Sequence, residues 1–208
     1  MHDIPSAVDA AIESLRTGGF VMLVDEPDRE DEGDLVVAAE FARPEHFTLM
    51  AERGRTLITL AMAAERVDAL GIRMMVNHNT ARYETPFTLS LDVKAGTTSG
   101  SSAIDRAATV RALLDPATKL AHFLMPGHVF PLRADPKGVF GRMGHTEGAV
   151  DLMRLGGLYP AALISEIQAP NGAMMRGAEL RTLAAECDAP VVSLAEIKAR
   201  LIEDQTAT

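Results

Sequence analysis

The sequence predicts an α+β protein built on one mixed β-sheet with helices on its faces. Three observations lead to this prediction. Short apolar runs typical of buried strands alternate with helical segments, but the alternation is irregular. Segment 87–93 alternates apolar and polar residues, which indicates a strand with one solvated face rather than part of a regular doubly wound fold. A length of 208 residues with 47% hydrophobic residues suits a single domain, which we expect to cover residues 1–208.

The first part of the chain is expected to alternate strands and helices around an acidic loop. A helix begins at Ser6 and ends at Gly18-Gly19, because a hydroxyl cap opens it and glycines close it. A second helix begins at Pro44 and ends near Gly54. Buried strands are expected at 20–24, 35–39 and 57–62, and a short helix ends at Gly71.

The rest of the chain begins with an irregular segment from Met74 to Pro86, followed by the alternating strand 87–93. A hydroxyl-rich loop, 96–102, then enters a helix in which Ser102 and Asp105 resemble a capping pair. The further expected elements are a loop or edge strand at 126–133, a helix after 141–147, a strand at 161–167, a helix at 179–186, a strand at 191–192 and a helix with a Ser193…Glu196 capping box.

Composition narrows the classes of function. The net charge of −9 disfavours nucleic acid and anionic membranes as partners, and it suits a divalent cation. One cysteine, Cys187, excludes an internal disulfide and a cysteine-based zinc site, and it fits a reducing compartment. The first residues lack the pattern of a signal peptide, and no apolar run reaches membrane-spanning length. We therefore expect a cytoplasmic protein.

The stretch 25–34 concentrates negative charge between two predicted strands. Seven of its ten residues are carboxylates, and Arg29 is its only cation. Charges this close repel one another, so the loop costs stability unless a cation offsets them. A solvated acidic turn is the simplest interpretation. Two features favour a binding site instead: Pro27 and Gly33 shape the backbone, and the fork of Arg29 suits a phosphate or substrate oxygen.

A calcium-binding helix–loop–helix is the closest structural rival for this loop. Asp28, Glu30, Glu32 and Gly33 occupy its first, third, fifth and sixth positions, but Ala39 replaces the bidentate glutamate of the twelfth. The segment before the loop also predicts a strand rather than a helix. A magnesium site with one or two direct carboxylates fits better, because magnesium keeps waters and leaves room for a substrate.

A second candidate site is the glycine-containing turn from Gly141 to Thr146, which we call the phosphate turn. Glycines let the backbone approach an anion, Arg142 adds positive charge, and the following helix offers free N–H groups. The alternative is an ordinary helix start capped by Thr146.

Three further side chains could carry chemistry. His145 could bind a metal and His128 could carry a proton, although a lone histidine is more often structural. Glu166 falls in an apolar strand, where burial would raise its pKa toward the range of a general acid or base, unless it lies on a surface face. Cys187 is expected to pack inside a helix, because no catalytic motif surrounds it.

Together these residues resemble one family closely, the 3,4-dihydroxy-2-butanone 4-phosphate synthases of riboflavin biosynthesis. The resemblance extends from about Ala7 to Leu201 and rests on five blocks in the family's order, which are far more specific together than any single motif. The blocks are 28–34 with Ala39-Glu40, Asn79-Thr80 before Phe87-Thr88, Gly100 with Ser102-Ala103 and Asp105-Arg106, 126–133, and 144–147.

The resemblance implies a lyase that converts D-ribulose 5-phosphate to L-3,4-dihydroxy-2-butanone 4-phosphate and formate. It implies Mg²⁺, with Mn²⁺ as an alternative, and no organic cofactor. It also implies a homodimer with a three-layer α+β fold and, because the chain ends at Thr208, the monofunctional form without a fused GTP cyclohydrolase II.

The resemblance also implies residue roles. Glu30 and His145 are the expected metal ligands. The catalytic set is His128, Glu166, Glu30 and Asp34, with His128 and Glu166 at the positions essential for proton transfer. The expected substrate contacts are Arg29, Glu30 and Asp34 on the sugar, Arg142, Met143, Gly144, His145 and Thr146 on the phosphate, and Glu166.

This assignment agrees with elementary chemistry. Enolising a ketose phosphate needs a base near the substrate carbons and a cation on the developing enediolate oxygens. The family route then loses the C1 hydroxyl, shifts the carbon skeleton and releases C4 as formate. Each step moves a proton or stabilises an oxyanion.

Several positions depart from the family pattern. Ser165 stands where a cysteine is expected, and Thr59 and Ala61 replace residues that are cysteine in some members. Met143 replaces a glycine of the phosphate turn, and Ser99 replaces a threonine. Because the inferred metal and proton-transfer residues are all present, these departures bear on rate and metal preference rather than on the activity itself.

Two alternatives from other classes remain open. A different metal-assisted ketose-phosphate enzyme, an isomerase or aldolase, would use the same sites but release no formate. A non-catalytic phosphate- or metal-binding module would bind ribulose 5-phosphate without turnover. The presence of both His128 and Glu166 argues against the module, because binding alone requires no proton transfer.

Overall fold

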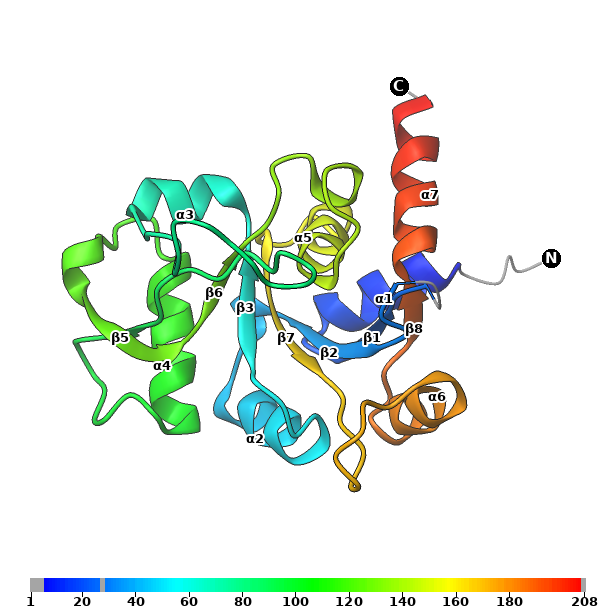
Figure 1. The fold of residues 1–208 in the computed structure, drawn as a ribbon, viewed down its shortest axis with the longest axis horizontal. Helices are drawn as coiled ribbons and strands as arrows, with labels where there is room; N and C mark the ends of the chain where they lie inside the picture. The colour runs from blue at the N-terminus through cyan, green and yellow to red at the C-terminus, as the bar shows by residue number, and fades with distance from the viewer. Residues whose placement is uncertain (1–5, 27–28, 207–208) are drawn as a thin grey trace.

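The computed structural model describes residues 6–26 and 29–206 and places a six-stranded mixed sheet at the centre of this part of the chain (Figure 1). The strand order is β6-β3-β7-β2-β1-β8. The three inner pairings are antiparallel, and the outer pairings β3–β6 and β1–β8 are parallel, which confirms a mixed sheet. The strands are β1 (Val21–Val24), β2 (Gly33–Ala38), β3 (Thr59–Met62), β6 (Pro131–Arg133), β7 (Ala161–Glu166) and β8 (Val191–Ser193).

Helices cover both faces of the sheet. One face packs against α1 (Ala7–Arg16), α5 (His145–Leu155) and α7 (Leu194–Thr206). The other packs against α2 (Pro44–Arg53), α3 (Ala64–Leu70), α4 (Ala103–Leu114) and α6 (Gly177–Glu186). Short 3-10 turns lie at η1 (Ala39–Phe41), η2 (Leu120–His122) and η3 (Gly138–Phe140).

The central strands serve both cores because side chains alternate across a strand. In β2, Leu35 and Val37 join the core beneath α2 and α4, whereas Val36 joins the core beneath α1 and α5. The inner strands are therefore continuous apolar runs, as expected for a sheet buried on both faces. These two cores give the three layers that the family resemblance implied, and the predicted α+β class is confirmed.

The expectation for segment 87–93 was partly wrong. Only β4 (Leu91–Val93) is a regular strand, and it pairs with β5 (Phe123–Val129) in a separate two-stranded sheet. Its polar side chains are buried rather than solvated. Thr88 Oγ1 donates to the Pro131 carbonyl at 2.9 Å, and Asp92 Oδ1 accepts from the His128 N–H at 2.8 Å. Alternation therefore marked buried hydrogen-bonding groups, not water.

Other predicted boundaries agree with the structure. Ser6 and Ser102 cap α1 and α4, and the Ser193–Glu196 capping box opens α7. Part of 126–133 forms β6, which is an edge strand as expected. Cys187 is an exception, because it follows α6 instead of lying within it. The single domain expected over residues 1–208 stays a prediction. No helix in the described part of the chain is long and apolar enough to cross a membrane.

Candidate active site

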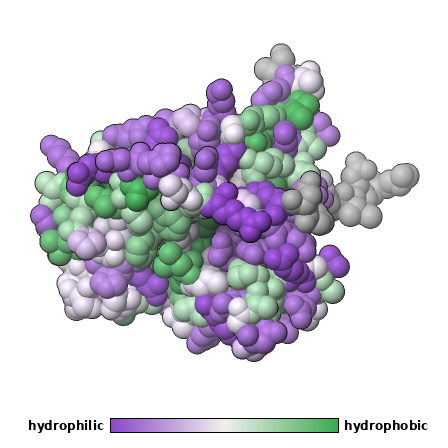
Figure 2. Space-filling view, viewed as in Figure 1, coloured by the Kyte–Doolittle hydropathy of each residue, from purple (hydrophilic) through white to green (hydrophobic). Residues whose placement is uncertain are grey.

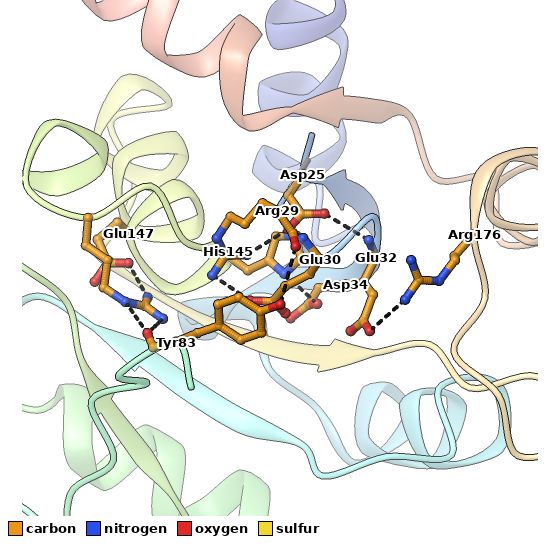
Figure 3. Close-up of polar contacts among 10 residues, drawn as sticks. Asp25, Arg29, Glu30, Glu32, Asp34, Tyr83, His145, Glu147 and Arg176 are labelled. Carbon is orange, nitrogen blue, oxygen red and sulfur yellow. Dashed lines mark hydrogen bonds and ion pairs between the residues drawn. The ribbon is translucent and has the colours of Figure 1, made fainter. Parts of the chain in front are cut away.

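A polar pocket lies where the acidic loop, the ends of β2 and β7 and the turn before α5 meet (Figure 3). Its lining combines apolar, hydroxyl-bearing and charged side chains. The lining residues are Arg29, Glu30, Asp34, Leu57, Thr59, Thr85, Phe87, Leu132, Arg142, His145, Thr146, Ile164, Ser165 and Glu166.

Asp25 organises the acidic loop from inside. Its side chain is fully buried and accepts hydrogen bonds from the backbone N–H groups of Glu30 at 3.2 Å and Glu32 at 2.9 Å. It also pairs with Arg29 Nη1 at 2.7 Å. A buried carboxylate needs such partners to offset its desolvation. The loop is thus wrapped around one carboxylate, while Glu30 and Asp34 line the pocket. Pro27 and Asp28 lie outside the described residues.

Two arginines neutralise only part of the remaining charge. Arg29 Nη2 lies 2.6 Å from Glu30 Oε1. Arg176, which precedes α6, approaches Asp31 at 3.5 Å and Glu32 at 3.7 Å, and Figure 3 shows the contact with Glu32. Burial, and then the charge of Glu30, raise the pKa of Glu32. The loop therefore keeps an excess of negative charge that a bound cation could balance.

Glu166, at the end of β7, adds a carboxylate to those of Glu30 and Glu32. Its Cα is the register partner of Asp34 on β2, so the two acids lie opposite each other across the strand pair. Glu30, Glu32 and Glu166 each offer an oxygen within 4.8 Å of the others, which is a spacing that suits a divalent cation.

The pKa of Glu166 is raised to about 7, first by desolvation and then by the charges of Asp34, Glu32 and Glu30. The residue as a whole is exposed, but it lines this pocket. There, loss of water and the neighbouring acids disfavour the charged form of its carboxyl group. A carboxyl group with such a pKa can exchange protons near neutral pH.

His145 and Asp34 form a buried pair beside these acids. His145 Nδ1 lies 3.0 Å from Asp34 Oδ1, and His145 Nε2 is buried without a hydrogen-bond partner among the described residues. A carboxylate that holds one ring nitrogen while the other points into a site is the usual support of a metal-binding histidine. The three carboxylates therefore fit a metal; His145 is not part of that group of donor atoms, but it lines the same pocket with its Nε2 unpartnered among the described residues. Burial lowers the pKa of His145, but Asp34 and then Asp25 outweigh it, so the pKa is raised. Metal binding would have to displace a proton.

The turn before α5 brings a buried ion pair to the other side of the pocket. Arg142 Nη1 lies 2.7 Å from Glu147 Oε2, and Glu147 is fully buried. Glu147 Oε1 also accepts from the Asp135 N–H at 3.0 Å. Burial raises the pKa of Glu147, with Arg142 opposing the shift. Gly144 is the N-cap and allows this packing, because a Cβ there would collide with Arg142 and Glu147.

The alternative of a helix capped by Thr146 is wrong, since α5 begins at His145 and Thr146 lies inside it. Thr146 is buried and lines the pocket. The first turn of α5 thus presents a hydroxyl and the free N–H groups of a helix start to the pocket.

The structure brings most of the predicted site residues together. Those in the pocket lining are Arg29, Glu30, Asp34, Arg142, His145, Thr146 and Glu166. Met143 instead packs against the core beneath α5, and Gly144 supports the turn from behind. His128 lies on β5, outside the pocket, with its Nδ1 2.8 Å from Asp92 Oδ2 and a side chain that is 47% exposed. The functional roles of all these residues stay predictions.

Four residues around the site were given no site role from the sequence: Asp25, Glu32, Tyr83 and Glu147. Two of them carried a local signal. Asp25 is four residues before Arg29, the spacing of a local ion pair, and Glu147 stands in the first turn of a helix next to the phosphate turn. Tyr83 had no such signal, because its contacts join segments that are distant in the sequence.

The fold and this pocket define a class of protein: an α+β fold in which a cluster of carboxylates and a buried histidine lie next to the start of a helix. A model of the family described as 3,4-dihydroxy-2-butanone 4-phosphate synthase matches residues 9–200. The chain belongs to this family. The predicted enzyme class is thereby confirmed, a lyase of riboflavin biosynthesis that converts ribulose 5-phosphate to 3,4-dihydroxy-2-butanone 4-phosphate and formate.

Individual relatives agree with the family match. The 3,4-dihydroxy-2-butanone 4-phosphate synthase of Agrobacterium fabrum is 44% identical over 190 residues, which cover 91% of this chain and 89% of that protein. The riboflavin biosynthesis protein RibBA of Aquifex aeolicus is 47% identical over 199 residues, which cover 94% of this chain and 49% of that protein.

A solved 3,4-dihydroxy-2-butanone 4-phosphate synthase in complex with two magnesium ions has a TM-score of 0.90 at 38% identity, covering 97% of this chain and 99% of that one. The corresponding protein of Candida albicans has a TM-score of 0.86 at 33% identity, covering 96% and 99%.

Proposed function

We propose that this pocket is the place where the family reaction occurs, with the phosphate of ribulose 5-phosphate at the start of α5 and its sugar carbons beside the acidic loop. One observation carries the proposal. Glu30 and Glu166, two of the three carboxylates spaced for a metal, line the same pocket as His145, Arg142 and Thr146 in the first turn of α5. A ketose phosphate needs both kinds of site within one molecule's reach.

The phosphate would be bound by Arg142, by Thr146 and by the helix start. Arg142 is held in place by the buried Glu147, so its guanidinium is ordered before the substrate arrives. Such preorganisation reduces the entropy that binding costs. The phosphate does not react, so its binding energy serves mainly to position the sugar.

The cation would be held by Glu30 and His145, with Glu32 and Glu166 in reach. When bound, it would supply positive charge to the substrate oxygens that become anionic during enolisation. A related structure contains magnesium ions, which supports a divalent metal. We infer Mg²⁺, with Mn²⁺ as an alternative, because carboxylate oxygens suit both ions. The residues themselves perform the proton transfers, so we infer no organic cofactor.

Glu166 is the candidate base in the pocket. Its pKa of about 7 lets it take a proton from a substrate carbon and return it later. Leu57, Phe87 and Leu132 line the pocket next to it and limit the access of water to reactive dicarbonyl species.

We infer a homodimer in which the second copy brings His128 to this pocket. His128 is fixed by Asp92 but exposed, and its strand also exposes Leu124 at 56% and Met125 at 41%. Ile104 on α4 is 67% exposed. Hydrophobic residues gather on the half of the molecule where β5 lies (Figure 2). Exposed apolar side chains around a preoriented histidine are consistent with a subunit contact.

Formate release tests the function. The protein with ribulose 5-phosphate and Mg²⁺ should release formate, and excess EDTA should abolish release. Isomerised or cleaved sugar without formate would favour the isomerase or aldolase alternative, and binding without turnover would favour the module. The single cysteine, which suits a reducing compartment, supports a cytoplasmic location as part of the proposal.

Mixed dimers test the placement of His128. His128→Ala and Glu166→Gln should each be inactive alone. If the pocket is shared, mixing and reassociating the two should restore activity, because one of the two pockets then has both residues intact. If each chain forms a complete site by itself, no activity should return. Light scattering at micromolar concentration should give twice the chain mass; a fully active monomer would contradict the dimer.

A further inference from the structure

Tyr83 lies at the mouth of the pocket, in the irregular segment between α3 and β4. The residue as a whole is 36% exposed. It has no role in the reaction proposed above and belongs to none of the motifs singled out from the sequence. Nevertheless it contacts both sides of the pocket (Figure 3).

The side chain of Tyr83 is anchored to the acidic loop. Its hydroxyl donates to the Arg29 carbonyl at 3.3 Å. Its ring lies under the Arg29 guanidinium, 5.2 Å from the ring centroid, which is within the range of a cation–π interaction. The same guanidinium pairs with Asp25 and Glu30. The ring therefore packs against the one cation inside the acidic loop.

The backbone of Tyr83 is anchored to the phosphate turn. Its carbonyl accepts from Arg142 Nε at 3.2 Å and from Nη2 at 2.9 Å. The third contact of Arg142 goes from Nη1 to Glu147. A guanidinium has five N–H donors. Two stay available for a phosphate, and the carbonyl and Glu147 fix the plane in which they lie.

We propose that Tyr83 is a positioning residue for substrate binding: its side chain, held by Arg29, places its carbonyl so that Arg142 is aimed at the substrate phosphate. This rests on the proposed function, in which Arg142 binds the phosphate and Arg29 contacts the sugar. Tyr83 sets the separation of the two arginines, and thereby matches the pocket to a sugar that carries a terminal phosphate.

The competing view is that Tyr83 only covers the pocket mouth or stabilises its loop. That view predicts lower thermal stability without a selective change in substrate affinity. A second competing view is that the carbonyl occupies the phosphate position and must leave. It predicts tighter substrate binding when the side chain is removed.

Three variants separate these views. Tyr83→Leu removes the ring and the hydroxyl, whereas Tyr83→Phe removes the hydroxyl alone. Arg82→Ala is the matched control, because the Arg82 guanidinium also lies over the Tyr83 ring, at 5.5 Å, but it is neither of the two arginines that the proposal links. Circular dichroism and melting curves establish that each variant folds. Formate release then gives KM for ribulose 5-phosphate and kcat.

Tyr83→Leu should raise KM about tenfold and leave kcat within about twofold, as expected from losing one cation–π contact and one hydrogen bond. Tyr83→Phe should raise KM by less, about two- to threefold, because it keeps the ring over Arg29. Arg82→Ala should match the parent. An unchanged or lowered KM in a folded Tyr83→Leu protein would overturn the proposal.

A double-mutant cycle shows whether Tyr83 acts through Arg142. In an Arg142→Ala background, Tyr83→Leu should change KM by less than about twofold, because the group it positions is gone. A full tenfold increase in that background would overturn the proposal, since Tyr83 would then act by another route. The parent protein is measured alongside: absence of formate from the parent would overturn the proposed function, whereas an active parent with unaltered Tyr83 variants would overturn only the role of Tyr83.

Discussion

The acidic loop and the phosphate turn face each other across one pocket, but they manage charge in opposite ways. In the phosphate turn, Arg142 is matched by one fully buried carboxylate, Glu147. In the acidic loop, Arg29, together with Arg176 from the start of α6, faces a larger number of carboxylates, and Glu166 adds one more from β7. The charges of the turn are thus balanced without a ligand, whereas the loop keeps an excess of negative charge.

We propose that this difference gives the two regions separate tasks. The turn, whose charges are balanced, serves recognition, because its hydrogen-bond donors are already oriented. The acidic loop, which keeps an excess of negative charge, would bind a cation, and that cation would take part in catalysis. Damage to the loop should therefore abolish chemistry, and damage to the turn should mainly weaken binding. The following predictions test that contrast.

Glu30→Gln should have the largest effect and lower kcat by at least about 1,000-fold, because a cation ligand contributes several kcal/mol of transition-state stabilisation. The metal-free protein should stay within about 1 kcal/mol of the parent, since loss of the pair with Arg29 is offset by relief of repulsion from Glu32 and Glu166. Magnesium should raise the melting temperature of the parent and raise that of the variant less.

The matched control is Glu26→Gln, which removes a charge from the same loop at a residue outside the pocket lining. It should keep both turnover and the magnesium-dependent melting shift. A Glu30→Gln protein that is destabilised but active would show that Glu30 is only the partner of Arg29, and the loop would lose its catalytic assignment.

Asp34→Asn should weaken metal affinity by about 10- to 100-fold, the usual cost of losing the carboxylate that supports a metal-binding histidine. The amide keeps the size of the side chain but no longer holds His145 Nδ1 through a negative charge. Titration with Mn²⁺, followed by electron paramagnetic resonance, measures this affinity directly. Unaltered affinity would indicate that His145 is not a ligand.

Arg142→Ala should raise KM for ribulose 5-phosphate about tenfold or more, with a smaller loss in kcat, because the phosphate is remote from the bonds that change. This substitution also leaves the buried Glu147 without its charged partner, which destabilises the fold. Combining it with Glu147→Gln should recover stability but not KM. A collapsed kcat at unchanged KM would place Arg142 in the chemistry and remove the contrast between the two regions.

The smallest effect is the pH dependence of stability caused by Glu166. Its folded pKa of about 7 lies above the ordinary value of 4.5, so the folded state holds the proton more tightly. This contribution to stability is complete below pH 4.5 and is lost as the pH rises through 7. Relative to Glu166→Gln, the metal-free parent should lose on the order of 1 kcal/mol between pH 5 and 8, after allowance for the exposure of the group. Urea denaturation at several pH values measures it, and parallel curves for the two proteins would contradict it.

Much of the fold could be predicted from local sequence. Ser6, Ser102 and Ser193 marked helix starts correctly because a hydroxyl cap is a local interaction. The short apolar runs marked the central strands because these strands are buried on both faces. Strand order could not be predicted, since the pairing of β2 with β7 joins residues more than a hundred positions apart.

The pocket was predictable where one motif carried the chemistry and not where contacts cross between segments. The acidic loop and the turn before α5 were found because charge and glycine are concentrated there. Tyr83 was missed because its meaning depends on Arg29 and Arg142 together. The alternation around Asp92 was misjudged for a related reason: its polar partner, the backbone of His128, lies on another strand.

The register of β2 and β7 has a consequence for motion of the sheet. Asp34 and Glu166 are cross-strand partners, and like charges in that position push an antiparallel pair apart. The strain lies at one end of the pair, while Ala38 and Ala162 close the other end with neutral contacts. Amide hydrogen exchange should therefore be faster at the pocket end, and a cation bound among the carboxylates should slow it there alone. The rate of amide hydrogen exchange in β2 and β7 would then show whether a cation is bound, before any substrate is added.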